Sequence, residues 1–317
     1  MIRRAALAVL LCLPVGSLFA TTPEAESLPT AEEALARDRY ERMTVPVTIG
    51  SSGPYRFLID TGAQATVITH GIVEDLGLPL RGQAMLVAMG SAQMVDLVEV
   101  HELRFADRVI TGLTSPLLHA GHIGADGILG LDSLQDLRVL IDFREERMLV
   151  ADADTLGGNS GYEIIVRARR KLGQMVITDA EVNGVRVAVV IDTGAQNSIG
   201  NRALLRKLRT RETGLVASVD VHGTQILSDL SYVRELEIGG MTMGNVAIGF
   251  NDSPIFHALD LAKRPALILG IGNMRVFDRV AIDFATRQVL FDIPGQADPT
   301  RARAMFQSDW PAIPQRQ

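Results

Sequence analysis

The chain has 317 residues, a formal net charge of −6 at pH 7, and few aromatic residues (5%). The acidic balance argues against a nucleic-acid partner, because proteins that bind nucleic acids present basic surfaces. The length suffices for two domains with cores of their own, and the shortage of aromatics predicts aliphatic, β-rich packing.

Residues 1–20 have the pattern of a secretory signal peptide: a basic start, an apolar run, and small residues before an expected cut after Ala20. The apolar run is short and is interrupted by Pro14 and Gly16, so it does not indicate a membrane span, although an uncleaved anchor is the alternative. Cys12, the only cysteine, lies in this leader. We therefore expect an exported protein, periplasmic or secreted, with no disulfide and no stable membrane span after signal removal.

Residues 21–42 form an acidic lead-in in which Thr30 and Glu33 have the form of a capping box, which predicts one short helix. From Thr44 the pattern changes to short alternating strands with glycine turns, which predicts two hairpins that each end at an aspartate, Asp60 or Asp192. The first hairpin runs through residues 45–49, 51–54 and 55–59, and the second through residues 176–182, the turn Asn183-Gly184 and residues 185–191.

The sequence Asp-Thr-Gly-Ala-Gln occurs twice, starting at Asp60 and at Asp192. Each copy is followed, in the same order, by a glycine loop, an apolar-apolar-Gly element and a pair of strands around Ile-Asp-Phe. Because the order is identical and the spacings differ only by small insertions, the chain contains two copies of one β-rich unit. These segments are residues 88–94, 126–134 and 139–150 in the first copy, and residues 221–227, 267–274 and 280–291 in the second.

Over roughly residues 43–295 these parts make the chain similar to an aspartic protease. Two copies in one polypeptide resemble the bilobal pepsin-like layout, whereas Ala63 and Ala195, which follow each Asp-Thr-Gly, look more like the retropepsin side of the family. The chain therefore looks like a bacterial retropepsin-like protein. The resemblance implies an all-β, bilobal acid-protease fold of two similar β-barrel-like lobes with a cleft between them. It also implies a peptide or protein substrate, no cofactor and no metal, and a monomer, since each half supplies one acid.

Asp60 and Asp192 are the candidate catalytic residues. Two carboxylates within hydrogen-bonding distance cannot both be ionised, so they share a proton. The ionised member would take a proton from a water molecule while the protonated member donates to the scissile carbonyl, and the pKa values would belong to the pair. In pepsin-like enzymes a hydroxyl after the glycine stabilises the ionised pair; because alanine cannot do so, we expect a less acidic optimum than that of a digestive enzyme.

The resemblance also implies roles for residues around the aspartates. Thr61 and Thr193 would hydrogen-bond across the lobe interface, while Gly62 and Gly194 permit close approach of the backbone. The glycine loops are flap candidates that would close over the cleft, with two ordinary surface hairpins as the alternative. We name residues 88–94 the first flap and residues 221–227 the second flap; the candidate flap residues are Gly90, Ser91, Gly223 and Thr224.

Other polar residues are interpreted as structural. Asp126, Asp142 and Asp283 have positions typical of turn or capping residues. His222 is a solvated loop residue in this interpretation, and His119 and His122 lack the spacing of a metal site. The basic residues of 202–211 predict an amphipathic helix, and those of 167–171 an exposed strand edge.

The expected organisation is thus a signal peptide (1–20), a lead-in segment with a short helix (21–42), an N-terminal lobe (43–156), a C-terminal lobe (157–295) and a flexible tail (296–317) that contains Trp310. The expected activity is that of an aspartic endopeptidase. The alternative is a non-catalytic envelope protein that keeps the fold and holds a peptide in the cleft, because a fold alone does not establish a function. The presence of both complete Asp-Thr-Gly motifs favours the enzyme.

Overall fold

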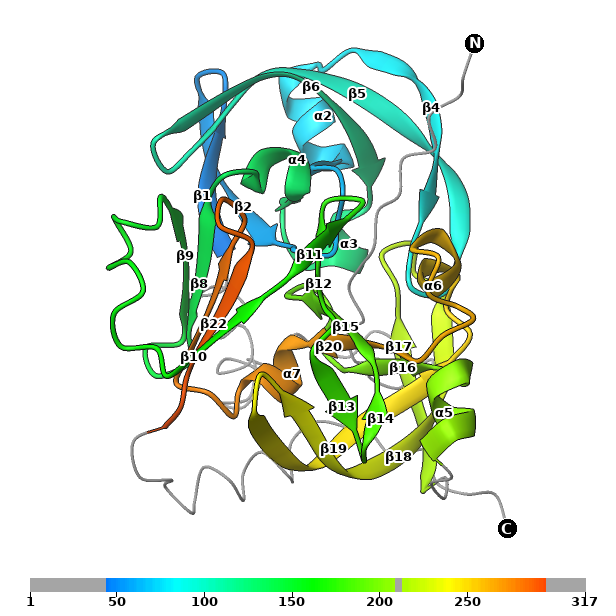
Figure 1. Cartoon of the computed structure of the whole chain (residues 1–317). Coiled ribbons are helices and arrows are strands. Elements are labelled where there is room, and N and C mark those ends of the chain that lie inside the picture. Colours follow the sequence, from blue (N-terminus) through cyan, green and yellow to red (C-terminus); the bar gives the residue numbers. More distant parts are fainter. Residues whose placement is uncertain (1–43, 209–212, 295–317) are drawn as a thin grey trace, which may run out of the picture.

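The structure is a computed structural model that describes residues 44–208 and 213–294. The expected signal peptide, lead-in helix and C-terminal tail lie outside the described residues. The described part is built mainly of β-strands in three sheets, with a few short helices at their edges (Figure 1). The predicted all-β, bilobal fold is therefore confirmed.

The first half of the chain forms a seven-stranded sheet in the order β1-β2-β7-β3-β6-β5-β4. An additional pairing between β1 and β5 closes six of these strands into a barrel. The elements are β1 (Thr44–Ile49), β2 (Ser52–Ile59), β3 (Val67–Thr69), α2 (His70–Leu76), β4 (Leu80–Val87), β5 (Ala92–Phe105), β6 (Arg108–Leu118), α3 (Ala120–Ile123), β7 (Gly127–Leu129) and α4 (Leu131–Leu134).

The second half forms a ten-stranded sheet in the order β11-β12-β15-β20-β16-β19-β18-β13-β14, with β17 paired to β18. Its centre repeats that of the first half: β15 pairs in parallel with β20 as β2 does with β7, and β16 pairs in parallel with β19 as β3 does with β6. The elements are β11 (Arg169–Lys171), β12 (Gln174–Ile177), β13 (Ala180–Val182), β14 (Val185–Arg186), β15 (Ala188–Asp192), β16 (Ile199–Asn201), α5 (Arg202–Leu208), β17 (Gly214–Val219), β18 (Gln225–Ile238), β19 (Met241–Asn251), α6 (Pro254–Ala258), β20 (Ala266–Gly270) and α7 (Ile271–Met274).

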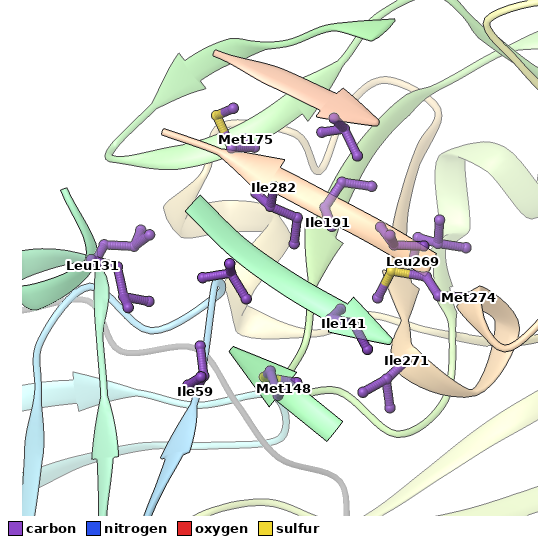
Figure 2. Packing of buried hydrophobic residues seen from close by; sticks show 14 of the residues in the cluster. Ile59, Leu131, Ile141, Met148, Met175, Ile191, Leu269, Ile271, Met274 and Ile282 are labelled. Atoms are coloured by element: carbon purple, nitrogen blue, oxygen red, sulfur yellow. The ribbon is translucent and has the colours of Figure 1, made fainter. Parts of the chain in front are cut away.

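A third sheet joins the two halves. Its order is β10-β22-β21-β8-β9, so that β8 from the first half pairs antiparallel with β21 from the second. Ile141 and Ile282 of this sheet belong to one buried cluster with Ile59 and Ile191, the residues that precede the two aspartates (Figure 2). The strands are β8 (Arg138–Asp142), β9 (Arg147–Ala151), β10 (Ile164–Arg167), β21 (Arg279–Asp283) and β22 (Gln288–Asp292).

The predicted turn at Asn183-Gly184 is confirmed, and it joins β13 to β14. Both residues have positive φ (47° and 76°), the conformation that makes an Asn-Gly pair a favoured hairpin turn. The prediction of one continuous strand over residues 176–182 was wrong. The chain breaks between Ile177 and Ala180 because β12 pairs with β15, whereas β13 crosses to pair with β18.

The two Ile-Asp-Phe aspartates act in turns, as predicted. Asp142 Oδ1 accepts hydrogen bonds from the amides of Arg144 and Glu145, each at 3.1 Å, and Asp283 Oδ1 accepts one from Thr286 at 2.7 Å. The predicted basic helix is present as α5, which buries two apolar residues, and the basic segment 167–171 lies on the edge strands β10 and β11. Across residues 44–208 and 213–294, no helix is long and apolar enough to cross a membrane.

Candidate active site

Each Asp-Thr-Gly loop begins where a buried strand ends. Asp60 follows β2 and donates its amide proton to Leu129 of β7 (3.0 Å), while Asp192 ends β15 opposite Gly270 of β20. Because β7 and β20 are the apolar-apolar-Gly elements, each of these elements fixes the strand that delivers an aspartate.

The glycines of these elements have a role that the sequence pattern did not reveal. A Cβ atom at Gly130 would lie 2.4 Å from the carbonyl carbon of Ala65, and one at Gly270 would lie 2.6 Å from Asn197 O. Real Cβ atoms do not approach backbone so closely, and only glycine lets each element lie directly under its aspartate loop.

Two threonines tie the loops together across the halves. Thr61 donates its amide proton to Thr193 Oγ1 (3.1 Å), and Thr193 donates its own to Thr61 Oγ1 (3.0 Å). Each hydroxyl then donates to a carbonyl of the opposite half, Thr61 to Ile191 (3.0 Å) and Thr193 to Ile59 (2.8 Å). These four buried bonds form the reciprocal arrangement that the resemblance implied.

Replacing Thr61 with valine should lower the free energy of unfolding by about 1–3 kcal/mol, because the buried amide of Thr193 and the carbonyl of Ile191 would lose their partner. Thr61→Ser keeps the hydroxyl and should retain most of the stability. Urea unfolding of both variants measures the effect. Equal destabilisation by valine and serine would show that packing, not the hydrogen bonds, matters at this position.

The two aspartate side chains lie close together and away from solvent. Both residues are 0% exposed, and a Cβ atom placed on Gly62 would lie 2.6 Å from the carboxyl carbon of Asp192. Asp60 Oδ1 accepts from the amides of Gly62 (2.8 Å) and Ala63 (3.0 Å). Asp192 Oδ1 accepts in the same way from Gly194 (2.9 Å) and Ala195 (3.1 Å). Gly62 and Gly194 therefore supply amides to the acids, and Gly62 also leaves room for the second one.

The environment of Asp60 and Asp192 favours the protonated forms of their carboxyl groups. Burial raises the pKa of both carboxyls, and the charge of Asp192 raises the pKa of Asp60 further, whereas the backbone amides at each Oδ1 act in the opposite direction. The Oδ2 atoms of the two residues are buried and receive no bond from any other group in the described part of the chain. The pair therefore resists double ionisation and has two oxygens available for a bound molecule.

The two flap candidates are hairpin tips that meet each other. The first flap covers the turn between β4 and β5, and the second covers the turn between β17 and β18. Gly90 and Ser91 of the first flap donate to the carboxylate of Asp220. Gln93 Nε2 of the first flap donates to Thr224 Oγ1 of the second flap (3.5 Å). Gly223 packs against His122, since a Cβ atom there would lie 2.8 Å from its ring.

Sequence reasoning missed three polar residues at this site. Asp220 directly precedes the second flap, Ser253 donates to the carbonyl of Met89 in the first flap (2.5 Å), and buried Gln174 donates to the carbonyl of Gly62 (2.6 Å). None has a counterpart in the other half of the repeat pattern, so the comparison of the two copies could not reveal them.

Three histidine rings contact one another. His119 stacks on His70 with ring centroids 4.3 Å apart, and His122 meets His119 edge-on at 5.6 Å. Asp126 accepts from the amide of Arg56 (2.8 Å), which is a structural role. His222 was predicted to be a solvated loop residue, but it also has a protein contact. Its ring nitrogen Nε2 lies 3.3 Å from the carbonyl oxygen of Leu86, in β4 just before the first flap. No metal-binding group of three or more residues occurs among those that the structure describes.

A two-lobed β protein with one Asp-Thr-Gly loop from each lobe in a shared buried site belongs to the class of acid-protease folds. A family model described as aspartyl protease matches residues 45–133 and 178–272, which is more than half of the chain. The chain therefore belongs to the aspartyl protease family.

Among solved structures, a retropepsin-like aspartic protease from Rickettsia conorii is similar at 20% sequence identity. The match covers 41% of this chain and 88% of that chain, with a TM-score of 0.29. A comparison with curated proteins gave no significant match.

Proposed function

We propose that this protein is an aspartic endopeptidase that hydrolyses peptide bonds with water activated between Asp60 and Asp192. The observation that carries the proposal is the joining of two Asp-Thr-Gly loops by reciprocal threonine bonds, which hold two buried carboxyls side by side. A protein that only binds peptides has no chemical need for a paired acid. Membership of the aspartyl protease family supports the same reaction class.

The mechanism follows from one proton shared by the pair. The ionised carboxyl removes a proton from water, whose oxygen adds to the scissile carbonyl carbon while the protonated carboxyl donates to the carbonyl oxygen. The tetrahedral intermediate then collapses and the C–N bond breaks. The leaving nitrogen takes the proton that one carboxyl removed from water, and a hydroxyl of the intermediate returns its proton to the other carboxyl, so the pair again holds one proton. The two Oδ2 atoms, which receive no bond from other described groups, are suited to hold the water and the carbonyl oxygen.

Two further parts of the proposal rest on the sequence. We propose that the protein acts outside the cytoplasm, periplasmic or secreted, because residues 1–20 have the pattern of a signal peptide. We also propose that it acts as a monomer, since both acids and both threonines come from one chain. Fractionation of cells and sizing of the purified protein test these points.

The test of the reaction is cleavage of a peptide library by purified wild type, Asp60→Asn and Asp192→Asn. Asp107 is exposed on the turn between β5 and β6, so Asp107→Asn is the matched control for loss of one carboxylate elsewhere. We expect wild type and control to cleave and both dyad variants to fail. Peptide binding without cleavage by all four proteins would instead support the non-catalytic alternative.

The pH profile should be bell-shaped in kcat/KM with its maximum above about pH 4, the ordinary pKa of an aspartate. Burial raises the pKa of both carboxyls, so the singly protonated pair persists to higher pH than it would in water. Activity falls at low pH as both carboxyls become protonated, and at high pH as the shared proton leaves. A maximum below about pH 3 would contradict this account.

A further inference from the structure

The carboxylate of Asp220 joins the tips of the two flaps. It is fully buried, and its Oδ1 accepts from the amides of His222 (3.0 Å) and Thr224 (2.9 Å) in its own turn. Its Oδ2 accepts from Ser91 Oγ (2.6 Å) and from the amide of Gly90 (3.3 Å) in the first flap. One oxygen therefore shapes the second flap, and the other holds the first.

The first flap is seated deeply in the second half of the chain. Its Met89 is 0% exposed, and the Met89 carbonyl accepts from Ser253 Oγ just before α6. At Gly90 a Cβ atom would lie 2.4 Å from Ile226 Cγ1, so the tip fits against the second flap without space to spare. The bonds to Asp220 thus lie at the centre of a packed contact between the two halves.

This contact belongs to the apolar cluster that extends to the two Asp-Thr-Gly loops. Met89 of the first flap and Ile226 of the second belong to the same buried apolar cluster as Ala63 and Ala195, which follow the two Asp-Thr-Gly motifs. Asp60 and Asp192 are 0% exposed, so a polypeptide reaches them only after a covering segment moves. In the described arrangement the two flap tips are joined.

We propose that Asp220 is a positioning residue that holds the two flap tips together, and that release of Gly90 and Ser91 from its Oδ2 is the step that admits a polypeptide. The assignment of the admitted molecule rests on the proposed function, whereas the separation of the tips does not. Asp220 touches no reacting group; it acts through the flaps. The reciprocal bonds of the threonines remain in place during this step, because they hold the floor of the site and not its cover.

Thiol labelling can measure the separation directly. Cys12 is the only cysteine, so a Cys12→Ala chain carries no other thiol, and Met89→Cys in that background places a thiol in the buried part of the first flap. Asp220→Asn keeps the side-chain shape and the Oδ1 acceptor but replaces the Oδ2 that faces Gly90 and Ser91 with an NH2 group, which donates and can accept from neither. Ser91→Ala removes a cross-tip bond and leaves the turn of the second flap intact.

We expect the thiol of Met89→Cys to react at least about tenfold faster when either Asp220→Asn or Ser91→Ala is also present. Loss of a hydrogen bond to a buried charged group shifts the equilibrium between joined and separated tips by about one power of ten or more. The matched reporter is Ile282→Cys, which is fully buried in the sheet between the halves and responds only to global unfolding. Its labelling rate should not change. An unchanged rate at Met89→Cys, or an equal rise at both reporters, would overturn the proposal.

Kinetics separate this proposal from the proposed function. If the tips must part before a peptide binds, kcat/KM of Asp220→Asn and Ser91→Ala should change in parallel with the labelling rate. A wild type that cleaves no peptide would refute the proposed function, yet the labelling result would stand. Unchanged labelling would refute the role of Asp220 even in an active protease.

Discussion

Replacing either aspartate of the pair with asparagine should abolish cleavage and also make the folded protein more stable at neutral pH. The loss of activity should be at least about 100-fold, the usual contribution of a general acid or base. The stability should rise by about 1–3 kcal/mol at pH 8, because the variant no longer buries a second carboxylate beside the first. Such opposed effects are expected where function requires a group that the fold disfavours.

The raised pKa values of the pair determine how the stability difference between variant and wild type changes with pH. Burial raises the pKa of both Asp60 and Asp192 in the folded state, so the folded protein binds protons more tightly than the unfolded chain. The stability that the pair contributes is complete below the unfolded pKa of about 4 and is lost as pH rises through the folded values. The advantage of Asp60→Asn over wild type should therefore be small at pH 4 and grow towards pH 8.

Urea unfolding at pH 4, 6 and 8 measures this difference. Asp107→Asn, which removes an exposed carboxylate, should follow the wild-type profile and so corrects for the general effect of net charge. A dyad variant that is less stable than wild type at pH 8 would show that the hydrogen bonds accepted by the carboxylates outweigh their burial, and would contradict the prediction.

The parts of the site that could be predicted from sequence are those carried by local pattern and repetition. Asp60 and Asp192 were recognisable because each follows an apolar strand and precedes the same four residues. The turn at Asn183-Gly184 was recognisable because both residues adopt positive φ readily. In each case the information lies within a few residues of chain.

The parts that could not be predicted depend on contacts between distant segments. Asp220 binds Ser91, 129 positions away, and Gln174 binds Gly62, 112 positions away, and neither contact leaves a trace in the local sequence. Asp283 was correctly assigned to a turn through its Oδ1, but its Oδ2 binds Arg138 from the other half. A hairpin pattern specifies its own turn, not which strand lies beside it.

Arg138→Met should strongly destabilise the protein, lowering the free energy of unfolding by about 3–5 kcal/mol. Arg138 is 1% exposed and pairs with Asp283, which is 0% exposed, through Nη2 at 2.6 Å and Nε at 3.1 Å. The guanidinium also donates to the carbonyl of Gly158 and to Asn159 Oδ1 (2.7 Å). Arg138 and Asp283 are direct cross-strand partners on β8 and β21, so the substitution leaves a buried, unpaired carboxylate in the sheet that joins the halves.

Arg147→Met is the matched control, because Arg147 lies on the adjacent strand β9 and pairs with Asp142 at 3.8 Å, but its side chain is 55% exposed. An exposed ion pair of this kind contributes less than about 1 kcal/mol. The double variant Arg138→Met with Asp283→Leu should recover much of the lost stability, since it removes both buried charges and fills the space with apolar groups. Urea unfolding of the three variants distinguishes an unpaired buried charge from lost packing: if the double variant is no more stable than Arg138→Met, the packing of the arginine, not its charge, holds the two halves together at this sheet.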